Sequence, residues 1–248
     1  MRSIAAALLI LIPLTLSAVE PGPVVFSELM WMGSTTSASD EWIELANRSE
    51  EPVDLAGWTI TRIRDGSELH MLEIEAGVLA PGQVFLISNF PPDDPRCMLA
   101  VEPDMVTSAV VLPNTRLDLR LYDGDPEAGA TLIDRADNGV GAPIAGDLQQ
   151  RHAMVRIHLD ADGTLPTSWA TAQEAIGWKP GATEMGTPGS LREVLSGMPA
   201  TTTEPPAQPN EPGDGDQTAD PGDTSGDQSE TAVHPVSWAQ LKGHSRLF

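Results

Sequence analysis

From residue 24 to residue 190 the chain is a series of short strand-forming runs separated by Gly, Pro, Asp and Asn. No apolar pattern in this region keeps a helical period for more than two turns. Alternation of apolar and polar residues over such short runs predicts half-buried β-strands, and the turn formers between them predict tight connections. This pattern indicates an all-β sandwich rather than an α/β enzyme.

The clearest pair of runs covers residues 40–47 and 52–61, and each run contains one Trp. Because side chains alternate between the two faces of a strand, Ile43 and Leu45 share one face and Trp42 and Glu44 share the other. The polar residues between the runs include Asn, Ser and Pro, so the segment is read as a strand, a turn and a strand.

We expect four residues of these runs to serve the fold directly. Ile43, Leu45 and Trp58 are predicted to lie in the core, and Gly57 is predicted to allow a tight approach of the backbone before its strand. The remaining pair, Trp42 and Glu44, is predicted to serve the fold or one of its faces. An aromatic and acidic pair that contacts carbohydrate is the alternative.

Other strands and turns follow the same signals. The Asp65-Gly66 pair predicts a hairpin turn, and Pro81-Gly82 predicts a turn in which glycine takes a positive φ. Residues 139–148 carry no strand pattern, and residues 191–195 are read as a brief exit helix or strand. Further strands are expected at residues 24–31, 69–74, 83–88, 105–112, 117–122, 131–135, 150–158 and 168–172.

The runs around Trp42 and Trp58 resemble the lamin-tail domain family, whose domain is an immunoglobulin-like β-sandwich of nuclear lamins and of secreted bacterial proteins. The resemblance rests on residues 41–47, 53–58 and 79–82, on Asp134, and on Trp169 together with residues 186–189. It implies a sandwich over residues 22–195 and a role in binding or tethering. Long inserts at residues 91–103 and 139–149 depart from a compact version of the domain.

Both ends of the chain differ from this region. Residues 1–18 have a basic start, an apolar run of about a dozen residues and small residues at the end, which predicts a secretory signal peptide. The apolar run is shorter than the ~20 residues of a spanning helix. We therefore expect a secreted or cell-envelope protein with no transmembrane helix in its mature form. An uncleaved membrane anchor is the alternative.

Residues 199–233 contain no Lys or Arg, few large apolar residues and many Pro, Gly, Thr and Asp. Such a segment is predicted to be a disordered acidic linker, because it cannot bury enough apolar surface to offset the entropy of ordering. Residues 234–248 restore apolar and basic residues and are read as a short basic-aromatic tag. An unstructured tail is the alternative.

The formal net charge is −22, from 14 Lys and Arg against 36 Asp and Glu. A nucleic-acid partner is not expected, because binding phosphates requires a basic surface. The one cysteine, Cys97, excludes an internal disulfide. It is expected to be a half-buried, small apolar residue in the loop of residues 91–103, and a bridge to a partner or to a metal is the alternative.

No set of residues defines a catalytic, cofactor or metal site. Residues 160–163 begin like a calcium loop, but the closing Glu is replaced by Thr171, so turn formation is preferred over a weak calcium site at Asp160 and Asp162 aided by Asp123 and Asp125. The spacing of His70, His152 and His158 matches no zinc set. The Gly-x-Ser-x-Gly motif of a nucleophile elbow is missing from the sequence.

These observations favour a secreted, non-enzymatic binding, adhesion or envelope-tethering module whose partner is a protein or another cell-surface component. Two alternatives remain open at this point. One is a secreted hydrolase with its site in the long loops, and the other is an envelope structural protein held by an uncleaved anchor.

Overall fold

The structure is a computed structural model that describes residues 21–191. The predicted signal peptide (1–18), linker (199–233) and tag (234–248) lie outside the described residues, as does most of the predicted exit segment at 191–195. Within the described range the chain forms β-strands and two short 3₁₀ helices and no α-helix. No helix in that range is long and apolar enough to cross a membrane.

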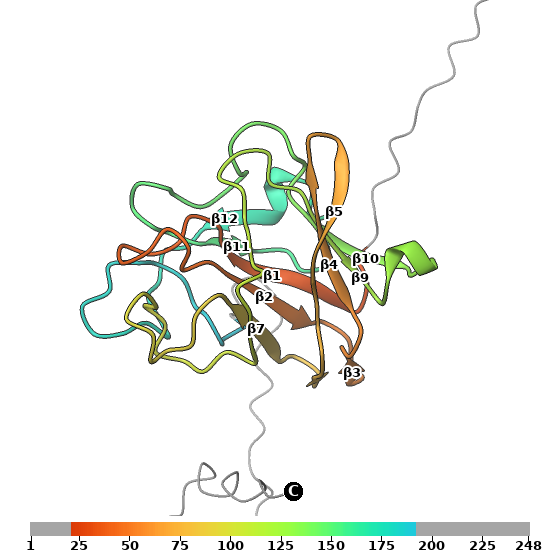
Figure 1. Cartoon of the computed structure of the whole chain (residues 1–248), viewed down its shortest axis with the longest axis horizontal. Helices are drawn as coiled ribbons and strands as arrows, with labels where there is room; N and C mark the ends of the chain where they lie inside the picture. The colour runs from red at the N-terminus through yellow and green to blue at the C-terminus, as the bar shows by residue number, and fades with distance from the viewer. Residues whose placement is uncertain (1–20, 192–248) are drawn as a thin grey trace, which may run out of the picture. The chain divides into compact units, whose positions relative to one another are not determined.

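The larger sheet has six strands in the order β12-β11-β1-β2-β7-β8. β1, β2 and β7 form its centre, are antiparallel, and lie side by side in Figure 1. The short strand β8 joins the sheet in parallel to β7. The bounds are β1 Val24–Met30, β2 Trp42–Asn47, β7 Val84–Ser88, β8 Met105–Val106, β11 Met154–Arg156 and β12 Trp169–Thr171.

The second sheet has four antiparallel strands in the order β10-β9-β4-β5. A separate two-stranded ribbon pairs β3 with β6. The 3₁₀ helices η1 and η2 precede β10 and β12, respectively. The bounds are β3 Val53–Asp54, β4 Thr59–Arg64, β5 Ser67–Glu73, β6 Val78–Leu79, β9 Leu119–Tyr122, β10 Leu132–Ala136, η1 Pro126–Ala128 and η2 Pro166–Ser168.

The two larger sheets pack against each other as an immunoglobulin-like sandwich, with β1 facing β10. Their inner faces supply alternate residues to one continuous apolar core, as expected for stacked sheets. The predicted core residues Ile43, Leu45 and Trp58 are all buried there. The largest fully buried aliphatic and aromatic side chains include Phe26, Leu29, Ile60, Ile74, Leu86 and Ile87.

Most predicted strands are confirmed, but two are shorter than expected. Of residues 105–112 only Met105–Val106 pair in a sheet, and of residues 150–158 only Met154–Arg156 do. In the remainder of these segments the backbone is held by turns, isolated bridges and side chains. An example is Asn89, whose side-chain amide donates to the carbonyl oxygen of Val110 at 2.8 Å. Residues 139–148 form no strand, as predicted.

Both predicted turns are confirmed by their backbone angles. Asp65 and Gly66 have φ values of 51° and 78°, as in the mirror-image turn that matches the twist of a hairpin, and they connect β4 directly to β5. Gly82 has φ 68° after Pro81, and the amide of Gln83 donates to the carbonyl of Ala80 at 3.1 Å.

The segment around the two Trp residues differs from the prediction in its connection. β2 belongs to the six-stranded sheet and β4 to the four-stranded sheet, so the chain crosses between sheets by way of β3. The predicted tight approach at Gly57 is wrong, because a Cβ there would meet nothing within 4 Å. Glycine is favoured at this position by its φ of 80°, which L side chains rarely adopt.

The outer face of the six-stranded sheet is also buried, because irregular loops cover it. Trp42, on that face, packs against Trp178 of the last loop with ring centroids 6.1 Å apart. Trp42 and Glu44 are 0% and 1% exposed, so the carbohydrate-contact alternative for this pair is wrong. Trp42 and Glu44 therefore serve the fold, which was the preferred prediction for this pair.

Candidate functional site

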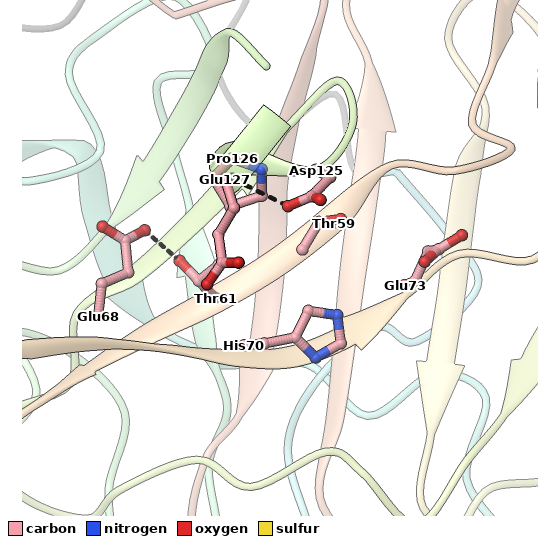
Figure 2. Close-up of a pocket in the computed structure, with 8 residues that line it drawn as sticks. All are labelled: Thr59, Thr61, Glu68, His70, Glu73, Asp125, Pro126 and Glu127. Atoms are coloured by element: carbon pink, nitrogen blue, oxygen red, sulfur yellow. Dashed lines mark hydrogen bonds between the residues drawn. The ribbon is translucent and has the colours of Figure 1, made fainter. Parts of the chain in front are cut away.

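An acidic cavity of about 520 Å³ opens on the outer face of the four-stranded sheet. Its size lies within the range of about 300–1,000 Å³ that is typical of ligand sites. Figure 2 shows its lining residues turned toward one space from β4, β5 and η1. It is called the acidic cavity below, and its lining consists of Thr59, Thr61, Glu68, His70, Glu73, Asp125, Pro126 and Glu127.

A β-bulge in β5 determines which side chains reach this cavity. Residues three apart in a regular strand point to opposite faces, so His70 and Glu73 should be separated. The pairing with β4 shifts by one residue between Thr61–His70 and Ile60–Leu72. Met71 and Leu72 are therefore both buried, while His70 and Glu73 both line the cavity.

Three side chains donate hydrogen bonds to Glu68 in the wall of the acidic cavity. Its oxygens accept hydrogen bonds from Thr61 Oγ1 at 2.6 Å, Tyr122 Oη at 2.8 Å and Arg120 Nη1 at 2.7 Å. Burial opposes its ionisation, but these hydrogen bonds and the Arg120 charge outweigh burial and lower the pKa of Glu68. Glu68 therefore remains ionised, and its oxygens already accept hydrogen bonds from neighbouring side chains. Such a carboxylate is better suited to a fixed negative charge than to proton transfer.

The opposite wall of the acidic cavity is the turn before β10. Asp125 caps η1 by accepting the amide hydrogen of Glu127 at 2.9 Å, and Pro126 occupies the first helical position. Gly129 ends η1 with φ 90°. The rigid turn holds Asp125 and Glu127 opposite β5, so the cavity presents four carboxylates and one imidazole.

A second group of carboxylates is buried in the six-stranded sheet. A bulge in β1 at Ser27 places Phe26 on the core face and Glu28 on the outer face, directly opposite Glu44 of β2. Both carboxyls are 1% exposed. Burial, followed by the charge of Glu44, raises the pKa of Glu28 to about 8, and burial raises the pKa of Glu44 to about 7.

The last described loop covers this buried pair. The Thr187 amide and hydroxyl donate to Glu28 at 2.9 and 2.8 Å, and the Gly189 amide donates to Glu44 at 2.7 Å. Ser27 Oγ donates to Glu44 at 2.8 Å. Such raised pKa values are typical of catalytic acids, but no substrate can reach these groups. The pair fastens the loop to the sheet.

A buried ion pair connects the two sheets. Arg156 Nη1 of β11 lies 2.6 Å from Asp134 Oδ2 of β10, which also accepts the Phe26 amide of β1 at 2.9 Å. The Arg156 guanidinium lies over the ring of Trp169, 5.5 Å from its centroid. The Trp169 indole donates to the carbonyl of Gly163 at 2.8 Å. These contacts are structural, because Arg156 and Asp134 are fully shielded.

The residues considered for calcium do not come together. Asp162 Oδ1 accepts the amide and hydroxyl of Thr164, both at 2.8 Å, and Asp123 Oδ1 accepts the Thr131 amide at 2.6 Å. Each of these aspartates therefore builds its own turn, in agreement with the preferred interpretation of these residues as turn formers. Among residues 21–191 no three carboxylate, imidazole or thiol groups are arranged to hold a metal ion.

The other singled-out residues are also dispersed. His70 lies in the acidic cavity, whereas His152 takes part in isolated bridges with Asp147 and Met185. His158 is exposed and its carbonyl accepts from Arg156. Cys97 is a free thiol in its loop, as predicted, but it is fully buried rather than half-buried.

Sequence reasoning did not identify the acidic cavity. His70 and Glu73 lie on one predicted strand and Glu68 immediately precedes it. The three-residue spacing between His70 and Glu73 was the only available signal of a bulge. Asp125 and Glu127 are more than fifty positions further along the chain. Nothing in the sequence indicates that η1 faces β5.

These features define an immunoglobulin-like sandwich with structural charge pairs inside and an open cavity on one outer face. The sequence model of the Lamin Tail Domain matches residues 17–165, which is more than half of the chain. The chain therefore belongs to the lamin tail domain family, whose immunoglobulin-like domain is non-enzymatic and compatible with a binding or structural module. A comparison with curated proteins found no match.

Proposed function

We propose that this protein is a secreted, non-enzymatic binding module that holds a cationic segment of a protein or other cell-surface component in the acidic cavity. The observation that carries the proposal is the cavity itself, with four carboxylates placed on rigid elements around about 520 Å³. Arg or Lys side chains of a partner would meet Glu73 and Glu127, which are exposed at the rim of the cavity. The net charge of −22 would speed the approach of such a partner.

The test compares two double variants with the same change of charge. Glu73→Lys with Glu127→Lys reverses the charge at the rim of the acidic cavity. Glu50→Lys with Glu51→Lys makes the same change at exposed residues outside it. The affinity of each variant for an oligolysine peptide is measured by isothermal titration calorimetry at physiological salt. We expect the cavity variant to bind about tenfold more weakly or worse, and the control to stay within about twofold.

Equal loss in both variants would show that only net charge matters and would overturn the assignment of the cavity. A native protein that does not bind the peptide would overturn it as well. Retention of the purified protein on its own cell envelope, measured with the same variants, extends the test to the native partner.

The hydrolase alternative receives less support from the geometry. The one imidazole of the acidic cavity, His70, shares it with Glu68, whose oxygens are already occupied by Thr61, Tyr122 and Arg120. The buried pair of Glu28 and Glu44 is closed to substrate. Turnover on a panel of phosphoester, glycoside or peptide substrates, lost on substitution of His70, would reverse this preference.

Export and tethering rest on the parts of the chain outside the described residues. The signal-like residues 1–18 support secretion, and the acidic spacer at 199–233 supports a tag at 234–248 held away from the domain. For a flexible chain of about thirty residues the span is some 30 Å. Sequencing the amino terminus of the mature protein tests cleavage, and an intact terminus favours the anchored alternative. Deletion of 234–248 should leave folding intact and reduce retention at the surface.

A further inference from the structure

Two adjoining cavities flank the tip of the β4–β5 hairpin, away from the acidic cavity. Their volumes are about 640 and 420 Å³, and they share Ile63, Asp65 and Arg116. Figure 1 shows this hairpin in orange, with the tip extending past the neighbouring strands. None of the residues that line these two cavities lines the acidic cavity. We refer to them together as the tip cavities.

The charge of the tip cavities is opposite to that of the protein as a whole. Three arginines line them, namely Arg62, Arg64 and Arg116, against the single carboxylate of Asp65. Arg64 Nε lies 3.8 Å from Asp65, with both side chains more than two-thirds exposed, so this pair is weak. A local excess of positive charge is unusual in a chain with a net charge of −22.

Two of these arginines retain unused hydrogen-bonding capacity. Arg62 donates from Nη1 to the carbonyl of Val111 at 3.1 Å, but its Nε is buried and has no partner among the described residues. Arg116 forms no ion pair with any residue of the described range. A guanidinium presents five donors in a fixed fork that fits a carboxylate or a phosphate.

The backbone holds Arg116 at this position in an unfavourable conformation. Its φ is 57°, and its amide donates to the carbonyl of Gly141 at 2.7 Å, while the Gly139 amide donates to Leu117 at 2.8 Å. Non-glycine residues with positive φ are uncommon, and such strained residues gather at ligand clamps.

We propose that the tip cavities bind a ligand that carries a compact oxyanion, either a carboxylate or a phosphate, beside an apolar portion. Arg116 and Arg62 would hold the oxyanion. The apolar portion would lie on Val111 and Val140, which are 44% and 74% exposed at the edges of the two cavities.

Two further carboxyls lie close to the tip cavities. Glu41 interacts with Arg62, but burial raises the pKa of Glu41 to about 8, so it is largely uncharged near pH 7. Asp118, beside Gly139, is already paired with Arg135 at 3.0 Å, and carboxylates more than about 8 Å away are screened at physiological salt, so the arginines dominate.

The test is a calorimetric and NMR titration of the native protein with inorganic phosphate, acetate and hexanoate. Arg116→Gln and Arg64→Gln are the variants at the tip cavities. Arg96→Gln is the matched control, because Arg96 is an exposed arginine outside these cavities and is already paired with Asp94. A melting temperature equal to that of the native protein shows that each variant is folded.

We expect Arg116→Gln to weaken oxyanion binding by about fivefold or more, Arg64→Gln to weaken it less, and Arg96→Gln to leave it within about twofold. Binding of phosphate alone, or of the carboxylates alone, supports the site and shows which of the two oxyanions it prefers. Tighter binding of hexanoate than of acetate supports the apolar portion. Absence of binding to all three probes overturns the proposal, as does equal affinity in Arg116→Gln and the native protein.

Discussion

Arg156 Nη1 and Asp134 Oδ2 lie 2.6 Å apart, and this ion pair connects β11 of the six-stranded sheet to β10 of the four-stranded sheet. Both side chains are almost completely removed from solvent, at 0% and 2% exposure. The guanidinium also donates to the carbonyl of Ala161, so one side chain holds a loop and two sheets together.

Removing one partner of this pair should be strongly destabilising, because it leaves an unpaired buried charge. We expect Arg156→Met to lower the free energy of unfolding by about 3–5 kcal/mol, measured by urea denaturation. Arg96→Gln, which breaks the partly exposed pair with Asp94 and the contact with the Phe90 ring, serves as the control and should lower the midpoint much less than Arg156→Met does. A similar midpoint for both variants would show that the buried pair makes no special contribution.

The buried pair of Glu28 and Glu44 should make stability fall as the pH rises. Their pKa values are raised in the folded state from 4.5 to about 8 and about 7, so the folded protein binds more protons than the unfolded chain above pH 4.5. The contribution of this pair to the free energy of unfolding is therefore fully present below about pH 4.5 and is lost between about pH 5 and 8. The largest slope per proton is about 1.4 kcal/mol per pH unit.

Glu28→Gln should reduce this pH dependence, since a neutral amide keeps the shape and an acceptor oxygen for Thr187. The melting temperature measured from pH 5 to 8.5 checks the expectation. Glu50→Gln is the matched control, because Glu50 is exposed in the turn after β2. If Glu28→Gln follows the native curve, the source of the pH dependence lies elsewhere.

Two glycine substitutions should destabilise for different reasons. A Cβ at Gly163 would lie 1.9 Å from the carbonyl oxygen of Arg135 and 2.7 Å from Arg156 Nη1, so Gly163→Ala forces the backbone apart. We expect a loss of more than about 2 kcal/mol. A Cβ at Gly57 would contact no other atom, so Gly57→Ala should lower the free energy of unfolding only by the cost of a left-handed φ, about 1–2 kcal/mol. Thermal unfolding ranks the two, and the reverse order would contradict the packing around Gly163.

Cys97 should be unreactive in the folded protein. The thiol is 1% exposed, and burial raises its pKa to about 11, so almost no thiolate exists near neutral pH. Ellman's reagent should react slowly with the native protein and fully after denaturation. Rapid reaction of the native protein would revive the alternative of an intermolecular bridge.

The strands could be read from the sequence because their determinants are local. The Asp65-Gly66 turn fixes the β4–β5 hairpin by its backbone angles alone, and the alternation of Ile43 and Leu45 identifies a core face. Asp134 and Trp169 were singled out only through the family resemblance, and the structure supplies their physical reason.

The interior polar groups could not be predicted, because loops distant in the sequence determine them. Alternation placed Glu44 opposite the core face, where solvent is the usual expectation. The segment around Thr187 and Gly189 covers that face, and it lies more than 140 residues further along the chain. The acidic cavity depends in the same way on the bulge at Met71 and on the position of η1.

The bond between Glu28 and Thr187 has a consequence for the order in which the chain can fold during synthesis. β1 is made among the first residues of the domain, yet its partner β11 and the loop that covers it follow more than a hundred residues later. Until that loop emerges, two carboxyls that belong inside the protein face water. The nascent chain therefore cannot close the outer face of the six-stranded sheet over these carboxyls until the domain is almost completely synthesised.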